Sequence, residues 1–284
     1  INKCFSKMGG FISKSEHVRN RFVKRSGWLL LAKLIPTLAF LAVTIVYSRN
    51  LPVEDYGIFQ AVWMITNVCV VLLGFGIYSV LLSSGIGSIK WLVNKNFKKF
   101  LFFFGTLLLI SYSIIFNLLS SQSDSLKILI ICVVIIHTIN FAYESILIRG
   151  NKEIYIFKLN LLYALLYFGW HLNFLSKKFD LFVLVLGVFV LGAVRLISYS
   201  ILSKKALKES NDENIKIQHW FFIGLNEVVG VVAKWLDKLL LVYFITPREF
   251  AIFFNGSIEI PLFGLIISVI GSSLLVEVSS NMAQ

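Results

Sequence analysis

The chain has 284 residues, a formal net charge of +12, a hydrophobic fraction of 57% and a mean hydropathy of +0.82. A soluble domain of this size could not bury that much apolar surface, so the composition excludes an ordinary globular protein and indicates membrane-spanning helices. The three cysteines lack the CxxC or Cys/His spacing that a metal site would need.

Eight apolar blocks are each long enough to cross a bilayer as a helix, which takes about 20 residues. In chain order the expected spans are residues 27–47, 58–83, 100–119, 126–148, 155–175, 181–202, 220–245 and 250–276. Residues 1–26 carry seven Lys and Arg but no apolar run, so they are not a cleaved signal peptide. The sequence therefore predicts an all-α polytopic membrane protein with eight transmembrane helices.

Most Lys and Arg residues lie in the polar gaps between these spans, where positive charge favours the cytoplasmic side. Seventeen lie in the gaps on the side of the N-terminus and five lie in the opposite gaps. This asymmetry predicts a cytoplasmic N-terminus. It also argues against nucleic acid as the partner of the positive charge.

A motif occurs twice, each time directly after a long apolar block. The first copy is Val46 to Phe59 (VYSRNLPVEDYGIF), and the second is Val242 to Phe253 (VYFITPREFAIF), about 195 residues later. Both contain Val-Tyr, a short spacer, Pro, Glu, an aromatic residue, a small residue and Ile-Phe. Because the first and seventh spans both start on the cytoplasmic side, the repeat predicts two bundles of parallel topology around an axis along the membrane normal.

The repeat and the long polar stretch after the sixth span define the expected domains. They are a basic cytoplasmic segment at 1–26, a six-helix bundle at 27–202, a cytoplasmic linker at 203–219 and the start of a second bundle at 220–284. Because the chain begins with Ile and holds only two spans of the second bundle, we expect it to be a truncated piece of a longer protein.

The seventh span carries four charges, although a charge at the centre of a membrane helix costs about 2.5–3.5 kcal/mol on insertion scales. Glu227, Lys234 and Lys238 are spaced i, i+7 and i+11, so they share one helix face. Asp237 lies beside them. One interpretation is an internal salt-bridge set in which the two carboxylates neutralise the lysines. The other is the polar wall of a water-filled cavity, and the two are compatible.

Other spans carry single ionisable groups, which are Lys33, Glu144, Arg195 and Glu259 in the first, fourth, sixth and eighth spans. Uncharged polar residues recur at helical spacing, among them Thr44, Asn67, His137, Asn140, Asn160, Tyr163 and Tyr167. Each alone is more often an interhelical hydrogen bond than a ligand contact, and Lys33 lies close enough to the cytoplasmic boundary to snorkel. Together they predict helices with one polar face turned inward, around a cavity or as packing contacts.

Two segments resemble one family of transporters. Arg49 to Phe59 (RNLPVEDYGIF) resembles the short outer loop of the polysaccharide-biosynthesis flippases, which include the O-antigen (Wzx-type) flippases of the multidrug/oligosaccharidyl-lipid/polysaccharide exporter superfamily. Trp235 to Phe253 resembles their seventh helix and the loop after it, including an Asp before an apolar run, here Asp237. The resemblance implies about twelve to fourteen helices in two bundles around a central cationic cavity.

The resemblance further implies that this cavity holds a lipid-linked, pyrophosphate-bearing oligosaccharide and moves its head group outward by alternating access. The candidates for pairing with the anion are Lys33, Arg195, Lys234 and Lys238. The candidates for charge balance, or for binding a coupling H⁺ or Na⁺, are Glu144, Glu227, Asp237 and Glu259. We therefore expect a multi-pass flippase of the bacterial inner membrane, not an enzyme, without catalytic residues, metal or cofactor. Membrane lipids and the polysaccharide polymerase machinery are further candidate partners.

Two alternatives stay open at this point. A multidrug exporter of the same superfamily would bind cationic drugs in an acidic or aromatic cavity, which the lysines of the seventh span disfavour. A membrane polymerase or glycosyltransferase would need a sizeable outer loop or a pair of carboxylates in an aqueous loop, and the sequence shows neither.

Overall fold

The computed structural model describes residues 2–84, 86–175, 180–208, 217–257 and 262–282, and it describes side chains at 22–84, 97–175, 180–204, 217–257 and 264–278. Within these residues the chain is helical apart from short turns, and no strand occurs among them. The described helices are α1 (Asn2–Asn50), α2 (Val53–Gly74), α3 (Ile77–Ser83), α4 (Ile86–Leu118), α5 (Asp124–Arg149), α6 (Glu153–Leu175), α7 (Leu181–Lys208), α8 (Ile217–Phe244), α9 (Pro247–Gly256) and α10 (Leu262–Met282).

Five of the described helices contain a segment long and apolar enough to cross a membrane. The segments are Phe22–Asn50, Val53–Gly74, Phe97–Leu118, Asp124–Arg149 and Leu181–Lys204. This confirms the predicted class, a helical membrane protein. Helices α6 and α8 occupy two further predicted spans and are of similar length, with 23 and 28 residues. The number of spans and their orientation stay predictions.

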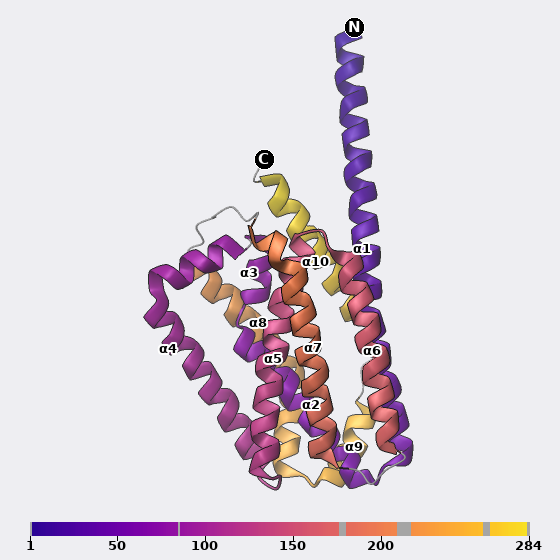
Figure 1. Cartoon of the computed structure of the whole chain (residues 1–284), viewed down its shortest axis with the longest axis vertical. Coiled ribbons are helices and arrows are strands. Elements are labelled where there is room, and N and C mark those ends of the chain that lie inside the picture. The colour runs from indigo at the N-terminus through magenta and orange to yellow at the C-terminus, as the bar shows by residue number, and fades with distance from the viewer. Residues whose placement is uncertain (1, 85, 176–179, 209–216, 258–261, 283–284) are drawn as a thin grey trace.

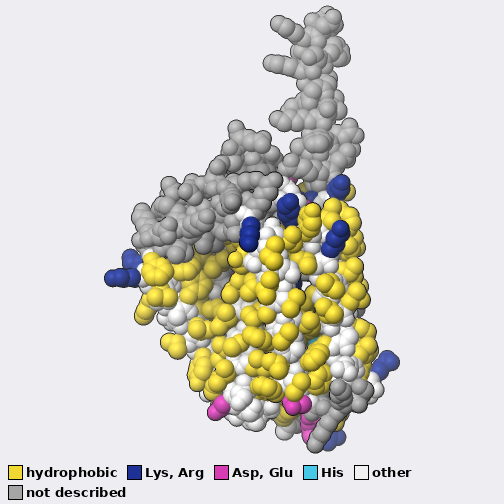
Figure 2. All heavy atoms as spheres, viewed as in Figure 1, with side chains coloured by type: hydrophobic (Ala, Val, Ile, Leu, Met, Phe, Trp, Pro, Cys, Tyr) yellow, Lys and Arg dark blue, Asp and Glu magenta, His cyan; other side chains and the backbone are white. Residues whose placement is uncertain are grey.

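The outer surface of the bundle is apolar. Figure 2 shows a wide apolar face, with Lys and Arg side chains along its upper edge and at its sides, and Asp and Glu side chains at its lower edge. Leu165 of α6 and Ile197 of α7 are 63% and 60% exposed. Soluble monomers rarely expose contiguous apolar surface of this extent, so the helices present this face to lipid.

Helix α2 occupies the middle of the bundle. Helix α1 lies along α6, and α5 lies along α7 (Figure 1). Helix α2 packs against α5, α8 and α9, and 14 of its 22 residues are buried. Helix α4 slants away from the other helices (Figure 1). The chain thus brings α8 and α9, which carry the second copy of the motif, against α2, which carries part of the first copy.

The predicted second span, residues 58–83, is not one continuous helix. Helix α2 ends at Gly74, and Phe75 and Gly76 adopt left-handed φ angles of 33° and 75° before α3 begins at Ile77. A side chain at Gly74 would overlap the ring of Tyr78, and Gly76 supplies the positive φ without a Cβ penalty. The glycines on both sides of Phe75 therefore explain why the helix breaks at this point.

The predicted eighth span, residues 250–276, is also divided. Helix α9 ends at Gly256, and α10 begins at Leu262. Glycine is a poor helix former because it loses most backbone entropy, which favours a helix end at this position. Glu259, a predicted charge-balancing residue, lies outside the described residues.

The two copies of the repeated motif pack against each other. Each copy lies where a long helix ends and another begins, at the turn from α1 to α2 and at the turn from α8 to α9. The Tyr56 hydroxyl donates a hydrogen bond to Asn255 Oδ1 at 2.6 Å. A Cβ atom at Gly57 would overlap the carbonyl group of Pro247. The motif thus forms two helical hairpins that approach at backbone distance.

Candidate functional site: a cavity between the two repeats

A cavity of about 380 Å³ lies among α1, α2, α5, α6, α7, α8 and α9. Three of the four predicted cationic residues line it, Arg195 from α7 and Lys234 and Lys238 from α8. Its volume lies within the range of small-molecule sites, about 300–1,000 Å³. The predicted inward polar faces thus meet around a real cavity, with one wall supplied by the second repeat.

Arg195 is compensated by protein groups. Its Nη2 atom lies 2.8 Å from Glu144 Oε2, and both side chains are buried, with 11% and 7% of their surface exposed. Its Nε and Nη2 atoms also donate to the Tyr199 hydroxyl at 3.1 and 2.9 Å. The guanidinium lies 5.1 Å from the ring centroid of Tyr163. Since a buried ion pair with satisfied hydrogen bonds needs no further counterion, Arg195 is a structural element of the wall.

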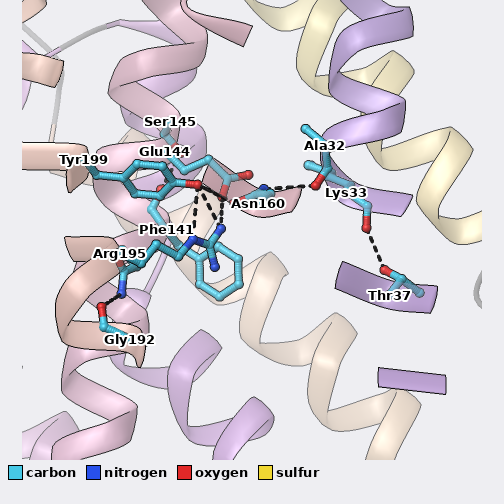
Figure 3. A network of polar contacts seen from close by, with 11 residues as sticks. Ala32, Lys33, Thr37, Phe141, Glu144, Ser145, Asn160, Gly192, Arg195 and Tyr199 are labelled. Carbon is cyan, nitrogen blue, oxygen red and sulfur yellow. Dashed lines mark hydrogen bonds and ion pairs between the residues drawn. The ribbon is translucent and has the colours of Figure 1, made fainter. Parts of the chain in front are cut away.

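The Arg195–Glu144 pair continues into a network that joins four helices (Figure 3). The Tyr199 hydroxyl donates to Asn160 Oδ1 at 2.7 Å, and Asn160 Nδ2 donates to the Ala32 carbonyl at 2.9 Å. Asn140 Nδ2 donates to the Gly192 carbonyl at 2.9 Å. The sequence analysis named both asparagines but not Tyr199. The position of Tyr199, one helical turn after Arg195, could have identified it. This network fixes α1, α5, α6 and α7 relative to one another.

The lysines of α8 have a different environment from Arg195. Lys238 Nζ lies 3.4 Å from Asp237 Oδ2, and the Asp237 side chain is 53% exposed. The ring of Trp235 lies 5.4 Å from Lys238 Nζ and 5.8 Å from Lys234 Nζ. Two lysines of α8 thus line the cavity on either side of Trp235, whose ring face favours nearby cations.

Glu227 does not complete the salt-bridge set predicted for α8. Its carboxylate accepts a hydrogen bond from the Gly76 N–H at 3.2 Å and another from the Ser79 hydroxyl. A Cβ at Gly76 would lie 2.7 Å from the main-chain N of Gly224, so the two backbones nearly touch here. Glu227 therefore caps the N-terminus of α3, where unpaired N–H groups attract a carboxylate. It fastens α8 to the break in the second predicted span.

Lys33, predicted to be a cavity cation, does not line the cavity. Its Nζ atom donates to Ser268 Oγ of α10 at 3.2 Å. Pro36 and Thr37, one turn further along α1, do line the cavity. The structure therefore brings together three of the four predicted anion-binding residues.

The remaining cavity wall is aromatic and apolar, with a few polar atoms. The aromatic lining comprises Phe40, Trp63, His137, Phe141, Tyr163, Tyr167, Trp235 and Phe254. Thr44 Oγ1, His137 Nε2 and Tyr167 Oη are buried and have no hydrogen-bond partner among the described residues. Buried polar groups are normally satisfied, so these three atoms are unusual features of the cavity wall. Among the described residues, no group of three His, Cys, Asp or Glu side chains could hold a metal ion.

Comparison with protein families, curated proteins and solved structures finds no match to this chain.

Proposed function

We propose that this chain is a membrane transporter of the polysaccharide-flippase type, which moves an isoprenoid-pyrophosphate-linked oligosaccharide across the bacterial inner membrane by alternating access. The observation that carries the proposal is the contrast between the cavity cations. Arg195 is paired with a buried carboxylate, whereas Lys238 is paired with Asp237, whose side chain is half exposed, and Lys234 lines the cavity one turn away on the same helix.

The charge on the α8 wall favours an anionic ligand. A cation in a low-dielectric site is stabilised by an anion at short range, and Lys234 and Lys238 place two cationic groups on this wall. A pyrophosphate group supplies the opposite charge and several strong acceptors. Because Lys is a compact point charge with three rotatable donors, the pair can follow a head group that changes its position.

The other walls favour a sugar attached to that phosphate. Ligand sites in proteins combine apolar and aromatic surface with a few placed polar groups. Here the rings of Trp63 and Tyr167 and the side chains of Thr44 and His137 line the cavity. Aromatic faces accommodate the C–H faces of a sugar ring, and the polar atoms accommodate its hydroxyl groups.

The position of the cavity between two repeats supports alternating access. Transporters with parallel repeats bind their substrate where the repeats meet, and one repeat then rocks against the other. In this chain α8 and α9 supply one wall, and they contact the first repeat through the Glu227 cap and the Tyr56–Asn255 hydrogen bond. These contacts are the ones that rocking would rearrange.

A binding measurement on the purified protein in lipid nanodiscs tests this proposal, with undecaprenyl pyrophosphate as the probe. We expect the double variant K234A/K238A to bind at least about tenfold more weakly, which is about 1.4 kcal/mol. The matched control is K158A/K204A, which removes two lysines that are exposed and outside the cavity lining. Equal affinity of the two double variants, or equal affinity for undecaprenol and its pyrophosphate, would rule the proposal out.

The second candidate is a multidrug exporter, which the aromatic side chains of the cavity would also suit. A lipophilic cation would gain from the rings through cation–π contacts but would be repelled by the two lysines. This candidate therefore predicts the opposite result for the same variant. Binding of tetraphenylphosphonium would strengthen in K234A/K238A, and undecaprenyl pyrophosphate would not bind.

A further inference from the structure

A second cavity, of about 420 Å³, lies between α4 and α8, outside the cavity of the proposed transport function. Its lining residues are Lys99, Phe100, Phe103, Ile217, Gln218, Trp220, Phe221 and Phe222. All of them belong to the first turns of two helical segments, the apolar segment Phe97–Leu118 of α4 and helix α8. On the predicted topology, the cavity lies at the cytoplasmic ends of these two spans.

The deep part of this cavity is built from aromatic rings in stacked and edge-to-face contact. Trp220 is 6% exposed, and its ring centroid lies 5.9 Å from that of Phe100 and 5.4 Å from that of Phe103. Phe75, at the break between α2 and α3, also packs on Trp220, with ring centroids 5.7 Å apart. The floor thus offers no polar group to a ligand other than the ring N–H of Trp220.

The shallow part of the cavity is open and polar. Lys99 and Gln218 are exposed at one end of the lining, and Phe221 and Phe222 are 44% and 67% exposed at its rim. Trp and Lys side chains at this depth typically face the lipid head groups. The cavity is thus apolar at its floor, with one cation and one amide at its mouth.

We propose that this cavity binds an anionic phospholipid, with an acyl chain among Phe100, Phe103 and Trp220 and the phosphate head group at Lys99. An acyl chain matches the apolar floor, because burial of apolar surface is favourable and needs no directional partner. An anionic head group matches Lys99, since basic residues near the membrane surface attract anionic lipids.

Tryptophan quenching by brominated lipids tests the site, because Trp220 forms its floor. A variant that retains Trp220 alone, with the other tryptophans replaced by Phe, is reconstituted with a small fraction of dibrominated phosphatidylglycerol or dibrominated phosphatidylcholine. The reference variant is F102W/W220F in the same background, because Phe102 lies on α4 at a similar depth and is 79% exposed to lipid. We expect several-fold stronger quenching of Trp220 by phosphatidylglycerol than by phosphatidylcholine, and no such preference at position 102.

Two lysine variants then separate a specific site from a general attraction to anionic lipid. K99Q should abolish the preference at Trp220, whereas K98Q should retain it, because Lys98 is the adjacent exposed lysine and does not line the cavity. Equal quenching by the two lipids, or equal loss of the preference in K98Q and K99Q, would overturn the proposal. Native mass spectrometry of the unaltered chain gives a second readout, namely retention of phosphatidylglycerol that is lost in K99Q and kept in K98Q. Neither result depends on the lysines of the transport cavity.

Discussion

Gly57 at the start of α2 lies directly against the main-chain carbonyl group of Pro247 at the start of α9. There is no space for a Cβ atom at position 57, and each residue belongs to one copy of the repeated motif. The contact shows that the two copies are related in space as well as in sequence. It also gives the interface between the repeats a backbone-to-backbone contact that tolerates only glycine.

We therefore expect G57A to destabilise the protein, by about 1–3 kcal/mol if the helices shift to admit the methyl group. The thermal unfolding midpoint in detergent, followed by intrinsic fluorescence, should fall. G105A on α4 is the matched control, because a Cβ there would meet no atom within 4 Å. A midpoint for G57A at or above that of G105A would contradict the close approach of the two motifs.

The ion pair of Arg195 with Glu144 should be structural. Removing one partner of a buried pair leaves an uncompensated charge and typically costs about 3–5 kcal/mol. E144Q should therefore lower the unfolding midpoint strongly, while the double variant E144Q/R195M, which removes both charges, should recover much of the loss. If E144Q unfolds at the same temperature as the unaltered chain, Arg195 has another counterion and its structural assignment is wrong.

The cap that Glu227 forms on α3 should depend on an acceptor more than on a charge. E227Q keeps one acceptor oxygen for the Gly76 N–H or the Ser79 hydroxyl, whereas E227A removes the acceptor from both donors. An unsatisfied buried donor costs about 1–3 kcal/mol, so E227A should be clearly less stable than E227Q. Hydrogen exchange of the α3 amides localises the effect. Faster exchange there in E227A, and much less change in E227Q, is the expected pattern; equal protection in the two variants would exclude the cap.

The turn from α8 to α9 should respond to acid. Glu249 accepts hydrogen bonds from the Thr246 backbone N–H and the Thr246 hydroxyl, both at 2.9 Å, and these hold the pKa of its carboxyl below its ordinary value of 4.5. Because the folded-state pKa is the lower one, the contribution of this cap is present above the unfolded-state pKa and is lost as the pH falls through the folded-state pKa. The unfolding midpoint of the unaltered chain should approach that of E249Q as the pH is lowered below about 4. A midpoint difference that does not change with pH would show that the charged carboxylate contributes nothing.

The sequence predicted the class of the protein and the two lysines of α8 that line its cavity. It did not predict the side-chain contacts that hold the helices around the cavity. Hydropathy alone identified the apolar helices, and helical spacing placed Lys234 and Lys238 on one face, which lines the cavity. The pairing of Glu144 with Arg195 could not be derived, because it depends on how α5 and α7 pack across 51 residues of sequence.

Glu227 and Lys33 were predicted to lie with the lysines of α8 at the cavity, and each makes a different contact for a physical reason. Glu227 shares a helix face with the lysines, but the break at Phe75 and Gly76 exposes N–H groups that compete for its carboxylate. That break was visible in the sequence only as two glycines around one Phe. Lys33 lies one turn from the cavity lining and reaches α10 instead, a contact between residues 235 positions apart.

The most direct test of the central claim is whether the side chain at position 234 lies in an aqueous cavity that an anionic lipid-linked ligand occupies. In a variant with Cys4, Cys69 and Cys132 replaced by Ala, K234C is treated with a membrane-impermeant thiol reagent, with and without undecaprenyl pyrophosphate. L236C, on the exposed apolar face of the same helix, is the control, because a thiol in lipid does not ionise and reacts poorly. The account predicts rapid labelling of K234C that the ligand suppresses, and negligible labelling of L236C. Labelling of K234C as slow as that of L236C, or labelling that the ligand leaves unchanged, would contradict it.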